Sequence, residues 1–249
     1  MRNIKLVLEY DGTDFVGWQR QPNGRSVQDE IEKALLQLIQ EKVNVIGAGR
    51  TDSGVHARGQ VANFRCDSDM DIKQINRGLA AIIPEDVSLV SLEETAFDFH
   101  ARYSARSRTY SYLITTSPVA LSRKYSWFVK YSLDAKLLER CAASFMGVHD
   151  FEYFCKDDSE VNNFLCSVTQ SFWTFNQNVL RYQIQANRFL HSMVRLLVGT
   201  MVDAARGYIS IDVVDSIFLN QDKSKPGPGS TRSGQVAPAK GLVLESIQY

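Results

Sequence analysis

The chain has 249 residues, which is enough to bury one large core or two smaller ones. Hydrophobic residues make up 44% and charged residues 22%, values typical of globular proteins that exclude the fibrous and disordered classes. No apolar stretch approaches the ~18 residues of a membrane span. The first residues also lack the apolar core and cleavage site of a signal peptide. We therefore expect a cytoplasmic protein that does not enter a membrane.

The charge balance and the cysteines do not by themselves identify a binding partner. Lysine and arginine together number 28, and so do aspartate and glutamate, so the net charge gives no indication of nucleic-acid binding. Arginines nevertheless cluster at Arg50, Arg58 and Arg65. Such a cluster can hold a phosphate backbone, although solvated arginine surface is the commoner explanation. The four cysteines form no C-x-x-C pair and the four histidines are scattered, so we expect reduced thiols and no metal site.

The first half of the chain alternates strands and helices. Period-two apolar patterns predict strands over residues 3–10, 43–46, 61–64 and 87–92. Helical spacing predicts a helix from the S-V-Q-D capping sequence at Ser26 to residue 40, and a second over residues 72–83 that Pro84 ends. A loop punctuated by glycines covers residues 47–54.

The second half is richer in strand. Strands are predicted over residues 110–115, 125–129 and 241–247, and a hairpin over 167–175 and 179–186. Helices are predicted over 133–146, over 190–206 with Gly207 at its C-cap, and over 210–219. A proline- and glycine-rich loop covers residues 223–235.

This order predicts an α+β protein made of two ferredoxin-like or RRM-like halves on antiparallel sheets. We place the boundary near residues 100–108. Residues 1–105 then form an N-terminal domain with the glycine loop, and residues 106–249 form a C-terminal domain.

The glycine loop carries the candidate chemistry. It begins like a dinucleotide fingerprint, but Asp52 stands where the third glycine is required. Glycines on both sides of Asp52 allow the backbone to approach a substrate closely. Asp52 is the only acid between Asn44 and Cys66, in a run with three arginines that favour its ionised form. An ionised carboxylate suits nucleophilic attack, while the plainer alternative is an aspartate that caps a turn and pairs with Arg50.

Two segments resemble signatures of the TruA-type tRNA pseudouridine synthases. They are Asp11-Gly12-Thr13-Asp14-Phe15-Val16-Gly17-Trp18-Gln19-Arg20-Gln21 and Gly49-Arg50-Thr51-Asp52-Ser53-Gly54-Val55-His56-Ala57. Further matches, in the family's order, are Phe99-His100-Ala101-Arg102 with Tyr110, Phe189-Leu190-His191-Ser192-Met193-Val194-Arg195, and Ala237-Pro238-Ala239-Lys240-Gly241-Leu242. The likeness runs from residue 4 to the C-terminus, and its G-R-T-D-x-G-V-H-A block is highly specific.

The resemblance implies the pseudouridine synthase fold and the isomerisation of uridine to pseudouridine, with Asp52 as nucleophile. It makes Arg195 the charge partner of the aspartate, with Arg50 in the same motif. Tyr110 matches the tyrosine that stacks on the target base. RNA-facing motifs of the family contain Arg20, Gln21, Arg58 and Arg102. Taken alone, Tyr110 also fits a plain core tyrosine, since it alternates with Tyr112 along a strand.

The resemblance further implies a tRNA substrate, modified in the anticodon stem-loop at uridines 38 to 40, and a homodimer whose two subunits contact one tRNA. It implies no cofactor and no metal. A stacked uridine does not present its glycosidic bond, so we expect the enzyme to flip the base into a pocket.

Two other hypotheses remain open. The chain could be a non-catalytic RNA-binding protein on the same fold. It could also be a small-molecule lyase or hydrolase that uses Asp52 with His56, which predicts a closed pocket and activity independent of salt. An RNA enzyme instead predicts an affinity that falls steeply as salt rises.

Overall fold

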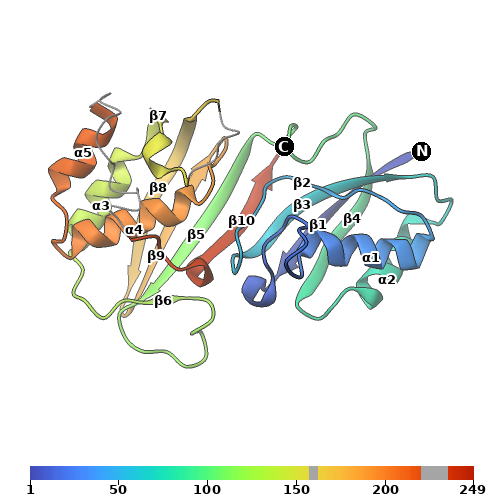
Figure 1. Ribbon diagram of the computed structural model, residues 1–249, viewed down its shortest axis with the longest axis horizontal. Coiled ribbons are helices and arrows are strands. Elements are labelled where there is room, and N and C mark those ends of the chain that lie inside the picture. Colours follow the sequence, from blue (N-terminus) through green and yellow to red (C-terminus); the bar gives the residue numbers. More distant parts are fainter. Residues whose placement is uncertain (157–161, 220–234) are drawn as a thin grey trace. The chain divides into compact units, whose positions relative to one another are not determined.

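The computed structural model describes residues 1–156, 162–219 and 235–249, and the chain divides into two compact units (Figure 1). Unit 1 comprises Met1–Arg106 together with Val243–Tyr249, and unit 2 comprises Ser107–Leu242. The predicted domain boundary placed the last strand, residues 241–247, in the C-terminal domain. In the structure that strand pairs with a strand of unit 1, because Val243 and Leu244 lie in register with His56 and Ala57.

Unit 1 is an antiparallel sheet with two helices. Its elements are β1 (Arg2–Tyr10), η1 (Gly12–Asp14), α1 (Val27–Ile39), β2 (Ile46–Gly47), β3 (His56–Cys66), α2 (Ile72–Ile82), β4 (Val87–Thr95) and β10 (Leu242–Gln248). The strand order is β4-β1-β3-β10, in which β10 alone runs parallel to its neighbour β3. Ile4, Leu6 and Leu8 of β1 are fully buried, which confirms the period-two pattern of the first strand.

Unit 2 consists of further, mainly antiparallel strands and three helices. Its elements are β5 (Ser107–Thr115), β6 (Trp127–Phe128), α3 (Ala135–Ser144), β7 (Gly147–Asp150), η2 (Glu152–Phe154), β8 (Leu165–Asn176), β9 (Val179–Ala186), α4 (Met193–Ala205), α5 (Ile211–Leu219) and η3 (Ala239–Gly241). The strand order is β5-β9-β8-β7, and β6 lies parallel to the end of β5. Every residue of α4 except Arg195 is buried, so α4 is the central helix of this unit.

The predicted α+β class is confirmed, and most predicted elements occur. The hairpin is confirmed, with Gln177 and Asn178 as its two-residue turn and a left-handed backbone at Gln177. The second helix begins with a capping box between Asp71 and Gln74. Residues 223–234 of the predicted loop lie outside the described residues.

The prediction of a strand over residues 43–46 was wrong, since β2 covers only Ile46–Gly47. Val43 and Val45 are buried alternately, as in a strand. However, side chains of α1 replace the partner strand: the N–H of Val45 donates to Glu32 Oε1 at 3.0 Å, and its carbonyl accepts from Gln28 Nε2 at 3.0 Å. The pattern therefore indicated burial correctly but not the hydrogen-bond partner.

Several boundaries also differ from the sequence prediction. The strand expected over 61–64 extends over His56–Cys66, and the one over 125–129 shrinks to Trp127–Phe128. The central helix begins at Met193 rather than at residue 190, and β7 was not predicted. No helix within the described ranges has both the length and the hydropathy needed to cross a bilayer.

Asn63 of β3 provides a test of the packing of unit 1. Its buried amide donates to Asn3 Oδ1 at 2.9 Å and accepts from the N–H of Ala101 at 2.8 Å. Asn63→Ala would leave both partners buried without a hydrogen bond, so we expect it to lower the free energy of unfolding by about 2–4 kcal/mol. Urea denaturation would measure this. Asn76→Ala, on the exposed side of α2, is the control and should change it by less than about 0.5 kcal/mol. Equal effects of the two variants would contradict this description of the core.

Candidate active site

The loop that carries Asp52 is fixed by backbone hydrogen bonds to the turn after β1. The N–H of Trp18 donates to the carbonyl of Thr51 at 3.1 Å, and the N–H of Gly54 donates to the carbonyl of Phe15 at 3.2 Å. Within the loop, the N–H of Val55 donates to the carbonyl of Asp52 at 3.1 Å. These bonds place Asp52 at the tip of a closed turn, with its side chain partly exposed.

Two glycines allow the two loops to approach this closely. A Cβ at Gly12 would lie 2.0 Å from the carbonyl oxygen of Val55. A Cβ at Gly17 would lie 2.6 Å from the carbonyl oxygen of Thr51, and Gly17 also has a φ of +114°. Both contacts are shorter than any side chain tolerates, so the D-G-T-D-x-x-G sequence is a packing requirement of the Asp52 loop.

A buried polar network supports the loop from the side of the sheet. Tyr10 Oη and Thr51 Oγ1 are 2.8 Å apart. Gln60 Nε2 donates to the carbonyl of Gly49 at 2.9 Å and approaches Tyr10 Oη at 3.4 Å. Burial raises the pKa of Tyr10 to about 12. Tyr10 is the last residue of the strand predicted over residues 3–10, but no sequence pattern could pair it with Thr51, which is 41 residues away.

His56 holds the turn at the start of this site. Its Nδ1 accepts from the N–H of Gly12 at 3.0 Å and lies 3.1 Å from Asp11 Oδ1, and the ring is buried. Asp11 in turn accepts from the N–H and the hydroxyl of Thr13. The ring nitrogen that faces this turn therefore anchors the backbone of η1.

The other predicted residues of unit 1 lie on its surface. Arg20, Gln21, Arg50, Arg58 and Arg102 are all exposed. Arg20 pairs with Glu32, and Arg58 Nη1 lies 3.3 Å from Glu245 Oε2. These ion pairs partly neutralise two of the arginines, so they add less positive field than the sequence alone indicates.

Tyr110 and Arg195 lie in unit 2. Tyr110 and Tyr112 point to the same side of β5, opposite Ile184 and Tyr182 of β9, and both are buried, which confirms the predicted alternation. The ring of Tyr110 meets that of Phe189 edge to face, with centroids 5.1 Å apart.

Arg195 fixes the segment that precedes η3. Its Nε donates to the carbonyl of Ala237 at 2.9 Å, and the N–H of Ala237 donates back to the carbonyl of Arg195 at 3.1 Å. Tyr112 Oη donates to the carbonyl of Pro238 at 2.7 Å. A Cβ at Gly199 would lie 1.6 Å from the carbonyl oxygen of Gln235, so this helix residue must be glycine for the segment to cross α4.

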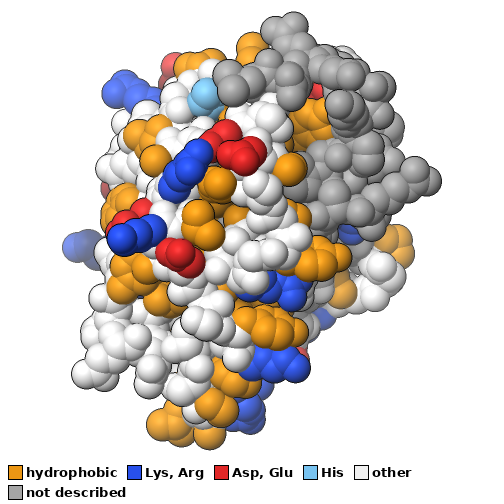
Figure 2. Space-filling view, turned by 90° about the vertical axis from the view of Figure 1, so that its left-hand side faces the viewer, with side chains coloured by type: hydrophobic (Ala, Val, Ile, Leu, Met, Phe, Trp, Pro, Cys, Tyr) orange, Lys and Arg blue, Asp and Glu red, His pale blue; other side chains and the backbone are white. Residues whose placement is uncertain are grey.

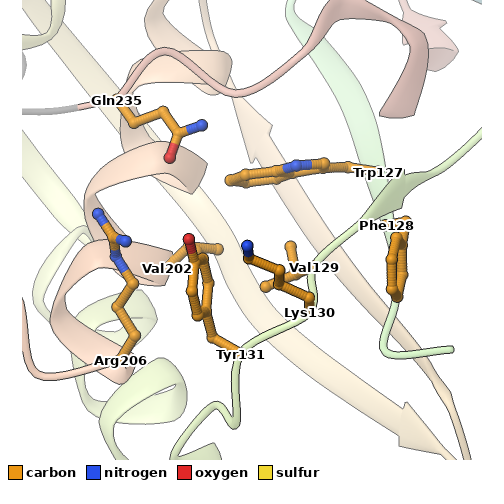
Figure 3. A pocket seen from close by; sticks show the side chains of 8 residues that line it. All are labelled: Trp127, Phe128, Val129, Lys130, Tyr131, Val202, Arg206 and Gln235. Atoms are coloured by element: carbon orange, nitrogen blue, oxygen red, sulfur yellow. The ribbon is translucent and has the colours of Figure 1, made fainter.

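A pocket of about 230 Å³ in unit 2 contains none of the predicted catalytic residues. Its lining consists of Trp127, Phe128, Val129, Lys130, Tyr131, Val202, Arg206 and Gln235 (Figure 3). Burial raises the pKa of the Cys141 and Cys166 thiols, to about 12 and about 11, and all four cysteines are thiols outside any disulfide. In the described ranges no three His, Cys, Asp or Glu side chains come together in a way that could hold a metal ion.

Oppositely charged side chains pair on the helical side of unit 2. The ion pair between Arg140 and Asp215 joins α3 and α5. In the view from that side, basic and acidic side chains lie next to one another in the middle of the face, and further basic side chains lie toward its lower edge (Figure 2).

Comparison with known proteins identifies the family of this chain. A family model described as tRNA pseudouridine synthase matches residues 6–104 and 141–249. The chain belongs to the tRNA pseudouridine synthase family. A relative from Acetivibrio thermocellus named tRNA pseudouridine synthase A is 39% identical over the full length of both chains. Relatives of the same name from Chlorobium phaeovibrioides and Chlorobium luteolum are 40% and 42% identical, and cover all of this chain and 100% and 96% of their own.

The matched ranges of the family model include the Asp52 loop and Arg195. Tyr110 falls between them, in residues 105–140. The supporting residues Tyr10, Thr51 and Gln60 fall within the first range, so the family match covers the loop together with the network that holds it.

The contact between Tyr10 and Thr51 can be tested by a double-mutant cycle. Tyr10→Phe and Thr51→Val each remove one hydroxyl with little change of shape. Because the two hydroxyls are buried and bonded to each other, we expect a coupling energy of about 1 kcal/mol in the free energy of unfolding. Strictly additive effects would show that the two side chains do not support each other.

Tyr10 also predicts a sensitivity to alkaline pH. Its pKa is about 12 when folded against 10.0 for a free tyrosine, so the unfolded chain loses this proton first. The stability that the neutral phenol contributes is complete below pH 10. It falls between pH 10 and pH 12, by at most about 1.4 kcal/mol per pH unit. Urea denaturation of wild type and Tyr10→Phe across this range should show a steeper loss in the wild type, and parallel curves would contradict the assignment.

Proposed function

We propose that this chain isomerises uridine to pseudouridine in the anticodon stem-loop of tRNA, at positions 38 to 40, with Asp52 as the nucleophile. The observation that carries the proposal is the position of Asp52 in the family's signature loop, at the tip of a turn fixed by Trp18, Phe15 and Thr51. A carboxylate held by rigid surroundings meets the substrate without first being ordered, which lowers the barrier to reaction.

The reaction conserves the atoms of the nucleotide. The bond between ribose C1′ and uracil N1 breaks with assistance from the Asp52 carboxylate, which acts either at the base or at the sugar. The freed uracil turns, and a bond forms between C1′ and C5. The proton on C5 leaves and a proton is gained at N1, so the reaction consumes no cofactor, metal or energy source.

Of the remaining predicted residues, we assign some to the Asp52 carboxylate and others to the RNA. Arg195 serves as charge partner of Asp52, and Arg50 lies in the same motif as the aspartate, two residues before it. Tyr110 stacks on the flipped uridine, a role that suits an aromatic ring already held by its near-perpendicular contact with Phe189. Arg20, Gln21, Arg58 and Arg102 contact the RNA backbone, where their exposed side chains can reach phosphates.

We further infer a homodimer that works in the cytoplasm. The tRNA is long compared with one small unit, so two subunits can share its contacts. A lyase or hydrolase that uses His56 as a base is less well supported, because the buried ring already binds the Asp11–Gly12 turn.

Tritium release from an anticodon stem-loop labelled at uridine C5 tests the proposal. We expect release by the wild type and a loss of at least about 10³-fold in rate for Asp52→Asn, because the amide is no nucleophile. Asp69→Asn is the matched control, since Asp69 is exposed and lies outside the loop, and it should react as the wild type does.

Two outcomes would reject parts of this proposal. Release by Asp52→Asn at the wild-type rate would remove Asp52 as nucleophile while leaving the reaction. Tight, salt-sensitive RNA binding without release by any variant would identify a binding protein rather than a synthase.

A further inference from the structure

The chain presents an exposed aromatic ring at the turn between β4 and β5. Tyr103 is 77% exposed, and Phe97 in the same segment is 57% exposed. Single exposed apolar side chains are common and need no explanation by themselves. Here, however, the surrounding residues hold the ring of Tyr103 in place.

The ring of Tyr103 rests on that of His100. The two centroids are 4.4 Å apart and the planes are inclined by 34°. His100 is itself fixed, because its Nδ1 accepts from the backbone N–H of Arg102 at 3.2 Å and of Tyr103 at 3.3 Å. The backbone N–H of His100 donates to Ser104 Oγ at 3.1 Å, and the N–H of Ser104 returns to the carbonyl of His100 at 2.9 Å. Hydrogen bonds of both the backbone and the side chains therefore hold this turn together.

The same turn is anchored in the core of unit 1. Ala101 is fully buried, and its N–H donates to Asn63 Oδ1 at 2.8 Å. Its carbonyl accepts from Tyr249 Oη at 2.8 Å. Ala101 also belongs to one apolar cluster with Ala48. The His100 ring that contacts Tyr103 is thus part of a turn bonded to the core, while most of Tyr103 is exposed.

An arginine lies close to each of the two exposed rings, Tyr103 and Phe97. The guanidinium of Arg102 lies over the ring of Tyr103, 5.7 Å from its centroid, and that of Arg65 lies over the ring of Phe97, 4.5 Å from its centroid. Arg65 Nη2 also donates to the carbonyl of Phe97 at 3.0 Å. An exposed aromatic ring with a guanidinium close to it is the combination that proteins use to stack an unpaired base and hold its phosphate.

We propose that Tyr103 is a stacking platform for an unpaired base of the substrate RNA, other than the uridine that is isomerised, and that Arg102 binds the adjoining phosphate. This rests on the proposed function, because it takes the RNA as substrate. Phe97 with Arg65 extends the surface toward a neighbouring nucleotide.

The platform and the Asp52 loop are close enough to contact one RNA loop. Ala101 and Ala48 lie in the same cluster. Tyr103 follows Ala101 by two residues, a reach of at most about 7 Å, and Asp52 follows Ala48 by four residues, at most about 14 Å. A base held at Tyr103 and a uridine presented to Asp52 are thus a few nucleotides apart.

The test compares Tyr103→Ala, Tyr103→Leu and Tyr103→Phe in the full-length protein, with the anticodon stem-loop RNA in a salt series. For the alanine and leucine variants we expect Kd and KM to rise about 5- to 150-fold, as loss of a base-stacking ring does, with kcat unchanged. Tyr103→Phe should bind as the wild type does. The slope of log Kd against log salt should stay the same, because no phosphate contact is lost, whereas Arg102→Gln should reduce it by about 0.7–0.9.

Replacing single loop bases with 2-aminopurine identifies the stacked nucleotide. One position should be quenched on binding to wild type and to Tyr103→Phe, and not on binding to Tyr103→Leu. Wild-type affinity of Tyr103→Leu, or a change in oligomeric state without a change in RNA affinity, would overturn the proposal, the latter in favour of a protein contact.

Failure of the platform and failure of the proposed function give different results. Ring-dependent RNA binding without tritium release would keep the platform and reject the isomerisation. Tritium release with RNA binding that does not depend on the Tyr103 ring would keep the isomerisation and reject the platform.

Discussion

The close approach of two loops in unit 1 is the constraint on which the candidate site depends. The turn after β1 touches the Asp52 loop through backbone atoms, and this is possible only because residues 12 and 17 have no side chain. Any larger residue would separate the loops and break the hydrogen bonds from Trp18 to Thr51 and from Gly54 to Phe15. The position of the carboxylate is thus a consequence of backbone packing more than of any contact of its own.

The polar network beneath the loop adds a second layer of restraint. Tyr10 and Gln60 come from neighbouring strands of the sheet and bind the loop at Thr51 and Gly49. Since these groups are buried, their hydrogen bonds are costly to break, and they link the loop to the two inner strands of the unit, β1 and β3. The Tyr103 turn follows the same plan, because it is tied to β3 through Asn63. Two surface features with proposed roles toward RNA are therefore supported by the same strand.

The sequence predicted the features that depend on local pattern. The alternation of β1, the helix that starts at Ser26 and the hairpin around Gln177 follow from side-chain periodicity and turn chemistry, and all three occur. It failed where a side chain takes the place of a strand, as Glu32 and Gln28 do at Val45. It also assigned β10 to the second half, since pairing in register with β3 over nearly 190 residues of chain leaves no local signal. Asp52 was found through its glycine-rich motif, whereas Tyr10 and Gln60 act through contacts that no spacing reveals.

Backbone amide exchange in the free protein tests most directly whether the Asp52 loop is formed before RNA arrives. The account predicts that the N–H groups of Trp18, Gly54 and Val55 exchange as slowly as those of β1 and β3, with little further protection when the stem-loop RNA is added. Rapid exchange at these three amides in the free protein, with protection appearing only on RNA binding, would show that the substrate orders the loop and would contradict the account.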